Sequence, residues 1–158
     1  MKLFPEAIGG ALGRIPSGCS ILTVARDDLS TGVLVSWVQQ AAFDPPSLSF
    51  CLKRGRPAGT LLVAGGRFLL NLLDEDPANM FRHFGRGFAL DEDAFVGLAI
   101  TPSAFGPILG ACPAHLGCEL RSKLMVGDHD LYVGEVIAAQ VTADFNPYVH
   151  LRRNGLSY

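Results

Sequence analysis

Residues 32–56 read Gly32-Val-Leu-Val-Ser-Trp-Val-Gln-Gln-Ala-Ala-Phe-Asp-Pro-Pro-Ser-Leu-Ser-Phe-Cys-Leu-Lys-Arg-Gly-Arg56, and their pattern determines the architecture expected for the whole chain. The apolar, β-branched run 33–38 predicts a buried strand. Asp44-Pro45-Pro46 cannot continue a helix and predicts a turn. Residues 47–52 alternate apolar and small polar side chains, which is typical of a half-buried strand. The stretch ends in three cations beside a Gly and a Pro, an arrangement that suits an anion: Lys53, Arg54 and Arg56.

The sequence on either side of this stretch predicts short strands and small helices. Strands are expected at 19–25, 31–38, 48–52, 67–73, 114–126 and 131–141. Helices are expected at 4–15, 57–64 and 74–84, with a further short helix at 91–97 and a surface excursion or weak strand at 101–113. No long helices alternate with the strands, which argues against a doubly wound parallel sheet. The prediction is a mainly β chain, an antiparallel Greek-key-type barrel of six or seven strands with small helices.

Composition narrows the class of protein. The 158 residues suit one domain, residues 1–158. A net charge of −2 gives no basic excess, which argues against a nucleic-acid partner. No apolar run approaches the roughly 20 residues of a membrane span. Pro5 and Glu6 interrupt the region where a secretory signal would be continuously apolar, so we expect a cytoplasmic protein.

One segment invites a metal interpretation, Cys112-Pro-Ala-His115-Leu-Gly-Cys118. Its spacing does not fit a zinc site, and a fourth ligand would have to come from elsewhere. We therefore expect no metal and interpret the cysteines as small buried side chains in a reducing compartment.

Five stretches together resemble the flavin reductase family, whose members have an FMN-binding split β-barrel. They occur in family order and are 11–18, 36–46 (Ser-Trp-Val-Gln-Gln-Ala-Ala-Phe-Asp-Pro-Pro), 67–71, 82–85 and 127–136 (Gly-Asp-His-Asp-Leu-Tyr-Val-Gly-Glu-Val). The tail 150–158 also resembles the end of the flavin reductase modules of some diiron flavoproteins. The resemblance implies a homodimer that binds FMN near its interface and is reduced by NADH or NADPH.

The resemblance also implies residues for the cofactor. The isoalloxazine ring would be lined by Leu34, Val35, Ser36, Trp37, Ala41 and Ala42, and the phosphate would be bound by Lys53, Arg54 and Arg56. If 57–64 is a helix, its N-terminus adds backbone N–H groups and a dipole behind the cations. Gly55 and Pro57 stand where the family often has hydroxyls, which leaves Thr60 as the hydroxyl candidate. The alternative interpretation, from the residues without the resemblance, is a solvated basic turn.

Ser36 has the size and donor capacity to stabilise a reduced flavin, and its alternative role is a strand hydroxyl bonded to a neighbour. Trp37 follows it in the strand, so the two side chains point to opposite faces. We therefore expect Trp37 to pack in the barrel or in the dimer interface.

Two histidines are candidate catalytic residues, His83 and His129, because imidazole titrates near neutral pH and can donate a proton. The alternatives are a helix-end cation for His83 and turn chemistry for His129. His115 is expected to be structural. His150 is also expected to be structural, or to stand with Tyr148 at the site entrance of the partner subunit.

The function predicted from these features is NAD(P)H:flavin oxidoreduction, in which FMN accepts hydride and electrons pass to an oxygenase or to a diiron flavoprotein that reduces oxygen or NO. Hydride transfer needs stacked rings more than acids or bases, so the absence of a catalytic triad does not count against an enzyme. Two alternatives stay open. One is an FMN-binding electron-relay module without efficient NAD(P)H reduction, and the other is an oxidase resembling pyridoxamine phosphate oxidases.

Overall fold

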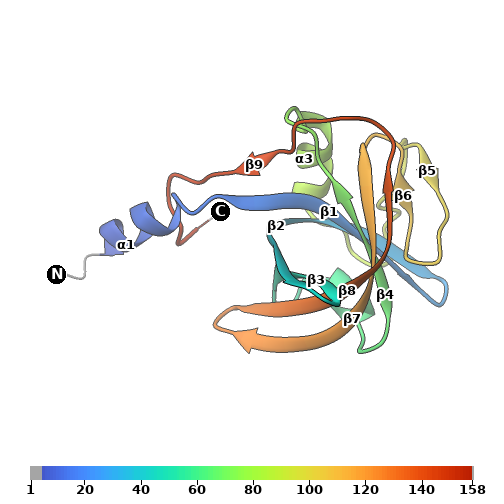
Figure 1. The fold of residues 1–158 in the computed structure, drawn as a ribbon, viewed down its shortest axis with the longest axis horizontal. Helices are drawn as coiled ribbons and strands as arrows, with labels where there is room; N and C mark the ends of the chain where they lie inside the picture. Colours follow the sequence, from blue (N-terminus) through green and yellow to red (C-terminus); the bar gives the residue numbers. More distant parts are fainter. Residues whose placement is uncertain (1–4, 158) are drawn as a thin grey trace.

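Six antiparallel strands close into a barrel in the computed structural model, which describes residues 5–157 (Figure 1). They are β1 (Ser17–Arg26), β2 (Leu29–Phe43), β3 (Pro46–Lys53), β4 (Arg67–Leu72), β7 (Ala114–Val126) and β8 (His129–Val141). Their order is β2-β3-β8-β7-β4-β1, and β1 pairs with β2 to close the barrel. The short β9 (Val149–His150) adds to β1 beside this closure. The predicted antiparallel barrel fold is confirmed.

The barrel interior is filled by side chains at alternate strand positions. Phe50 lies at its centre, stacked on Tyr132 at 5.0 Å and edge-on to Phe68 at 5.2 Å between ring centroids. All three rings are buried. Burial of each such side chain stabilises the fold by about 1.5–3 kcal/mol. The alternation predicted for residues 47–52 holds, because Leu48, Phe50 and Leu52 are buried and the residues between them are only half-buried.

A second buried layer joins residues 100–109 to the barrel. These residues form β5 (Ile100–Thr101) and β6 (Ile108–Leu109), and the backbone N–H of Leu109 donates to Asn71 Oδ1 at 2.9 Å. The Asn71 amide donates to the Ile21 carbonyl, and His115 Nδ1 lies 3.0 Å from Asn71 Oδ1. His115 is thus engaged in a core hydrogen-bond network. Among residues 5–157, no three His, Cys, Asp or Glu side chains are grouped as metal ligands would be.

The helices are shorter than predicted. They are α1 (Pro5–Leu12), α2 (Ala58–Leu61) and α3 (Ala78–Gly85), and residues 91–97 form turns instead of a helix. The predicted helix 57–64 is reduced to four residues because the chain is already extended at Leu62. The predicted helix 74–84 begins four residues late because Asp74 forms a strand-like bridge with Pro147. Phe4, where the first helix was expected to begin, lies outside the described residues.

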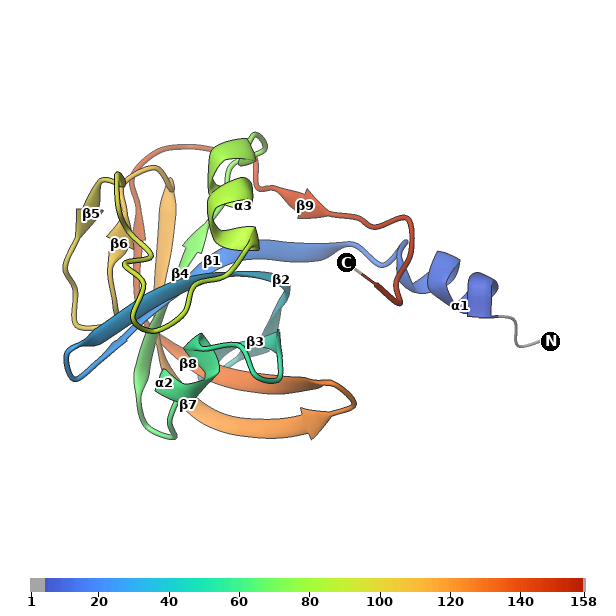
Figure 2. The same cartoon turned by 180° about the vertical axis from the view of Figure 1, so that it is seen from behind.

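Helix α1 and the C-terminal segment form an arm, residues 5–16 and 149–157, that extends away from the barrel (Figures 1 and 2). Two backbone hydrogen bonds join its halves, Gly155 N–H to the Gly9 carbonyl at 2.7 Å and Arg152 N–H to the Gly13 carbonyl at 3.0 Å. A Cβ at Gly13 would lie 2.5 Å from the Arg152 carbonyl oxygen, so this close approach requires glycine. No described helix, in the arm or elsewhere, is long and apolar enough to cross a membrane.

Candidate functional site

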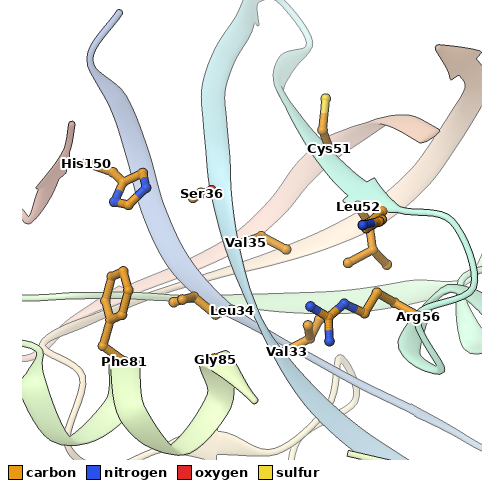
Figure 3. A pocket seen from close by; sticks show the side chains of 11 residues that line it. Val33, Leu34, Val35, Ser36, Cys51, Leu52, Arg56, Phe81, Gly85 and His150 are labelled. Atoms are coloured by element: carbon orange, nitrogen blue, oxygen red, sulfur yellow. The ribbon is translucent and has the colours of Figure 1, made fainter. Parts of the chain in front are cut away.

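A cavity of about 220 Å³ opens between β2 and β3 (Figure 3), and we call it the β2–β3 cavity. Four separate parts of the chain supply its lining: β2, the end of β3 with the turn after it, α3 and β9. The lining residues are Val33, Leu34, Val35, Ser36, Cys51, Leu52, Lys53, Arg56, Phe81, Gly85 and His150. Five of them were expected at a cofactor site: Leu34, Val35, Ser36, Lys53 and Arg56.

Strand β2 is held in position where it borders this cavity. The Ser17 hydroxyl donates to the Ser36 carbonyl, which joins the start of β1 to the middle of β2. The register between these strands shifts between Gly18 and Ser20, and the pairing continues beyond the shift, where Gly18 opposes Val38. The shift leaves Ser36 half-buried beside the opening.

Helix α3 borders the cavity because one of its phenylalanines packs directly on β2. Phe84 is fully buried, and a Cβ on Gly32 would lie 2.5 Å from its ring. The absence of a side chain at Gly32 thus allows the helix to approach the strand. Phe81 and Gly85, three residues before and one after Phe84, are brought to the same cavity beside Leu34 (Figure 3).

The three predicted phosphate ligands are divided between two locations. Lys53 and Arg56 line the β2–β3 cavity, and the Arg56 guanidinium reaches Gly87, where a Cβ would lie 2.6 Å from Nη1. Arg54 instead faces the β7–β8 turn, where its guanidinium donates to the Gly127 carbonyl. Its Nε also lies 3.4 Å from Asp130 Oδ1.

The helix dipole predicted behind these cations is not provided by the structure. Helix α2 has four residues, and its N-cap residue Pro57 makes no side-chain capping bond. The hydroxyl of Thr60, the remaining hydroxyl candidate, donates to the Pro57 carbonyl at 2.8 Å instead of lining the cavity.

A second cavity of about 470 Å³ lies on the other side of Lys53, and we call it the β3–β8 cavity. Its lining comes from the strands and from the arm: Trp37, Lys53, Asp128, His129, Arg152, Gly155, Leu156 and Ser157. Lys53 and His129 are direct partners in the β3–β8 ladder, so their side chains emerge side by side. Lys53 is therefore common to both cavities.

His129 is held by a neighbouring acid and a neighbouring ring. Its Nδ1 lies 2.8 Å from Asp128 Oδ1, and because a carboxylate only accepts, the imidazole donates this bond. The hydrogen bond from His129 lowers the pKa of the Asp128 carboxyl. The Trp37 indole lies 4.8 Å from the imidazole, and the Arg152 guanidinium lies 4.8 Å from that indole. Within the chain, Trp37 therefore packs against His129 and Arg152, and its expected place in a dimer interface stays a prediction.

The remaining expected site residues lie elsewhere. Ala41 and Ala42 follow on the outer half of β2, and neither lines the β2–β3 cavity. His83 does not line it either, because its Nε2 lies 2.8 Å from the Ala94 carbonyl. Its ring packs between Phe84 and Phe88, at 4.7 and 5.1 Å.

Sequence reasoning missed several lining residues. Phe81 immediately precedes the stretch Arg82-His-Phe-Gly85, so the stretch that resembles the family begins one residue after it. Cys51 occupies the face opposite the core positions of β3, and partial burial raises the pKa of its thiol. His150 was expected to be structural or to reach the partner subunit's entrance. Here it lines the cavity of its own chain, because β9 pairs with β1 at Ser17.

Comparison with known proteins identifies this arrangement. The family model described as "Flavin reductase like domain" matches residues 12–155. The chain belongs to the flavin reductase-like family. A curated relative, "Putative diflavin flavoprotein A 3" of Nostoc sp., is 36% identical over 161 residues. That match covers the whole chain but only 28% of the relative's length.

Two solved flavin reductases share the fold. The styrene monooxygenase flavin reductase of Pseudomonas putida S12 is 28% identical with a TM-score of 0.75, and the match covers 90% of each chain. The flavin reductase HpaC, solved in complex with NADP+, is 26% identical with a TM-score of 0.77, and the match covers 95% of each chain. The barrel described above is thus the split barrel of flavin reductases.

The residues of the β2–β3 cavity fit a flavin. An apolar strand face suits the isoalloxazine ring, and Lys53 and Arg56 supply charge for a phosphate. Cofactor pockets usually measure roughly 300–1,000 Å³, so this cavity alone is small for a nucleotide-sized ligand. The β3–β8 cavity shares Lys53 with it and is a separate space of about 470 Å³.

Proposed function

We propose that the chain is an NAD(P)H-dependent oxidoreductase that binds FMN and passes reduced flavin or electrons to an oxygenase or to an oxygen- or NO-reducing flavoprotein. The observation that carries this proposal is the β2–β3 cavity, in which an apolar strand adjoins two cations, Lys53 and Arg56. Bound FMN would supply the hydride acceptor, its N5 atom, for reduced nicotinamide.

In this proposal the residues have separate tasks. Lys53 and Arg56 bind the phosphate, and neither forms an ion pair with an acid within residues 5–157. Leu34 and Val35 present apolar surface to the ring. Ser36 offers a half-buried hydroxyl at the ring's side. Trp37, whose neighbours are His129 and Arg152, borders the adjoining cavity instead.

We assign the nicotinamide nucleotide to the β3–β8 cavity. Lys53 and Arg152 offer two cations for its phosphates, and His129, whose Nδ1 donates to Asp128, lines this cavity beside Lys53. His83 was the other candidate catalytic residue. Its bond to the Ala94 carbonyl favours a role in fixing the segment after α3.

We also propose a homodimer. The outer half of the barrel carries exposed apolar side chains, with Phe43 at 90%, Val141 at 70% and Ile137 at 42% exposure. An apolar groove of about 360 Å³ lies nearby, bordered by Val38, Leu116 and Val136. A second copy of the chain would bury these groups. Sedimentation of the purified chain tests this, since a monomer at micromolar concentration would contradict it.

The functional test follows the visible absorption of FMN bound to the purified chain under anaerobic conditions. We expect bleaching after addition of NADH, of NADPH or of both. Retention of FMN without bleaching by either nucleotide would favour the electron-relay module, and a chain that retains no flavin would contradict both. Repeating the titration with FAD determines which flavin binds more tightly.

A further inference from the structure

His150 lies on the opposite side of the β2–β3 cavity from Arg56 (Figure 3). Its position is fixed by β9, which pairs with β1 so that His150 opposes Ser17. The imidazole packs near Phe81 and Tyr148, with ring centroids 5.8 and 6.2 Å away. Leu34 and Ser36 lie between this aromatic group and the cationic side of the cavity (Figure 3).

The Nδ1 atom of His150 is buried and makes no hydrogen bond with any of residues 5–157. A buried polar atom without a partner is unfavourable, and an apolar ring would pack at this position without that cost. A half-turn about Cβ–Cγ exchanges Nδ1 with Cδ2, so the nitrogen can be turned towards a ligand in the cavity. The side chain thus has hydrogen-bonding capacity that the described chain leaves unused.

The surroundings of His150 favour the neutral form of its imidazole. Burial lowers the pKa of His150, and the nearby positive charge of Arg152 lowers it further. A neutral imidazole carries one N–H donor and one lone-pair acceptor, whereas the charged form carries donors only. The heteroatom edge of an isoalloxazine ring presents both acceptors and an N–H donor, and a neutral imidazole can pair with either kind.

We propose that His150 is a flavin-contact residue, which hydrogen-bonds the polar edge of the isoalloxazine ring at the side of the cavity opposite the phosphate. This inference rests on the proposed function, because it takes the cations Lys53 and Arg56 as the phosphate site. A ligand anchored there extends past Leu34 and Ser36 towards His150 and Phe81 (Figure 3). Once the imidazole has made the half-turn, the polar edge of the ring meets the Nδ1 atom of His150, which lacks a partner among residues 5–157.

The test compares the wild-type chain with His150→Phe, His150→Gln and Tyr148→Phe. Flavin fluorescence titration gives the Kd for FMN and for riboflavin, and urea denaturation gives the stability of each flavin-free chain. We expect His150→Phe to weaken both flavins by the same factor, roughly 3- to 10-fold, because the lost bond is to the ring. Its flavin-free stability should equal or exceed that of the wild type. His150→Gln should bind more tightly than His150→Phe, and Tyr148→Phe should bind like the wild type.

The outcomes separate this inference from the function it rests on. Equal Kd values for His150→Phe and the wild type would overturn the inference and leave the proposed function intact. A loss of affinity in His150→Phe accompanied by a matching loss of flavin-free stability would also overturn it, since that describes a purely structural residue. A wild-type chain that binds neither flavin would overturn the proposed function and the inference together.

Discussion

The Nε atom of Arg54 lies 3.4 Å from the buried Oδ1 atom of Asp130, so this cation is directed to the β7–β8 turn while Arg56 lines the cavity. The other carboxylate oxygen of Asp130 lies 2.8 Å from Lys123 Nζ, and this hydrogen bond raises the pKa of the Lys123 ammonium group. Two cations therefore neutralise one carboxylate that is 7% exposed. Residues only two positions apart thus have different tasks, and two matched variants test this difference.

Replacing Arg54 with Ala should lower the free energy of unfolding by about 1–3 kcal/mol, because Asp130 loses one of its two cations and Gly127 loses a donor. Urea denaturation measures this loss. The Kd for FMN should change less than threefold in the folded variant. A large loss of FMN affinity with unchanged stability would instead make Arg54 a phosphate ligand.

Replacing Arg56 with Ala should raise the Kd for FMN by about 10- to 100-fold, as expected for a charge-assisted hydrogen bond of about 1.5–3 kcal/mol. Riboflavin has no phosphate, so its Kd should stay within a factor of two. Stability should be close to that of the wild type. Equal weakening of both flavins would show that Arg56 contacts the ring or shapes the cavity.

Stability should fall as the pH falls below about 6.5, because burial lowers the pKa of His115 in the folded chain. The unfolded chain then binds a proton that the folded chain excludes, so the slope is positive and at most about 1.4 kcal/mol per pH unit for this residue. His150, whose pKa is also lowered, adds a slope of the same sign. Urea denaturation between about pH 7.5 and pH 5.5 measures it. A His115→Gln variant should give a shallower dependence, and an unchanged slope would exclude His115 as a cause.

The packing of the arm should require glycine at position 13 but not at position 10. Gly13→Ala places a Cβ 2.5 Å from the Arg152 carbonyl oxygen, and we expect a loss of about 1–3 kcal/mol. No atom lies within 4 Å of a Cβ built on Gly10, so Gly10→Ala should stabilise α1 by about 0.5–1 kcal/mol. Denaturation of both variants checks the contrast. Equal effects would mean that the arm does not pack in solution as described.

Much of the barrel was predictable because its strands follow simple alternation. Residues 47–52 have the predicted inward and outward faces, and the Gly127-Asp128 turn joins two long strands as expected. The helices were less predictable, since Asp74 looks like a helix start until its bridge to Pro147 is known. That bridge is a contact between distant parts of the chain, which local propensity does not encode.

The lining residues of the candidate site that are neighbours in sequence could be predicted. Those that are brought together from distant segments of the chain could not. Nothing in Lys53-Arg54-Gly-Arg56 distinguishes the middle cation, because its partner Asp130 comes from another strand. His150 reaches the β2–β3 cavity only because β9 adds to β1. Phe81 faces the cavity only because Gly32 admits Phe84.

Lys53 borders both cavities, and this has a kinetic consequence if the chain binds two anionic ligands as proposed. One ammonium group cannot fully neutralise two phosphates at once, so the flavin and the nicotinamide nucleotide should antagonise each other's binding. Saturating nucleotide should then accelerate dissociation of flavin from the chain. The same lysine that helps to retain the cofactor would thereby help to release it for delivery to an acceptor.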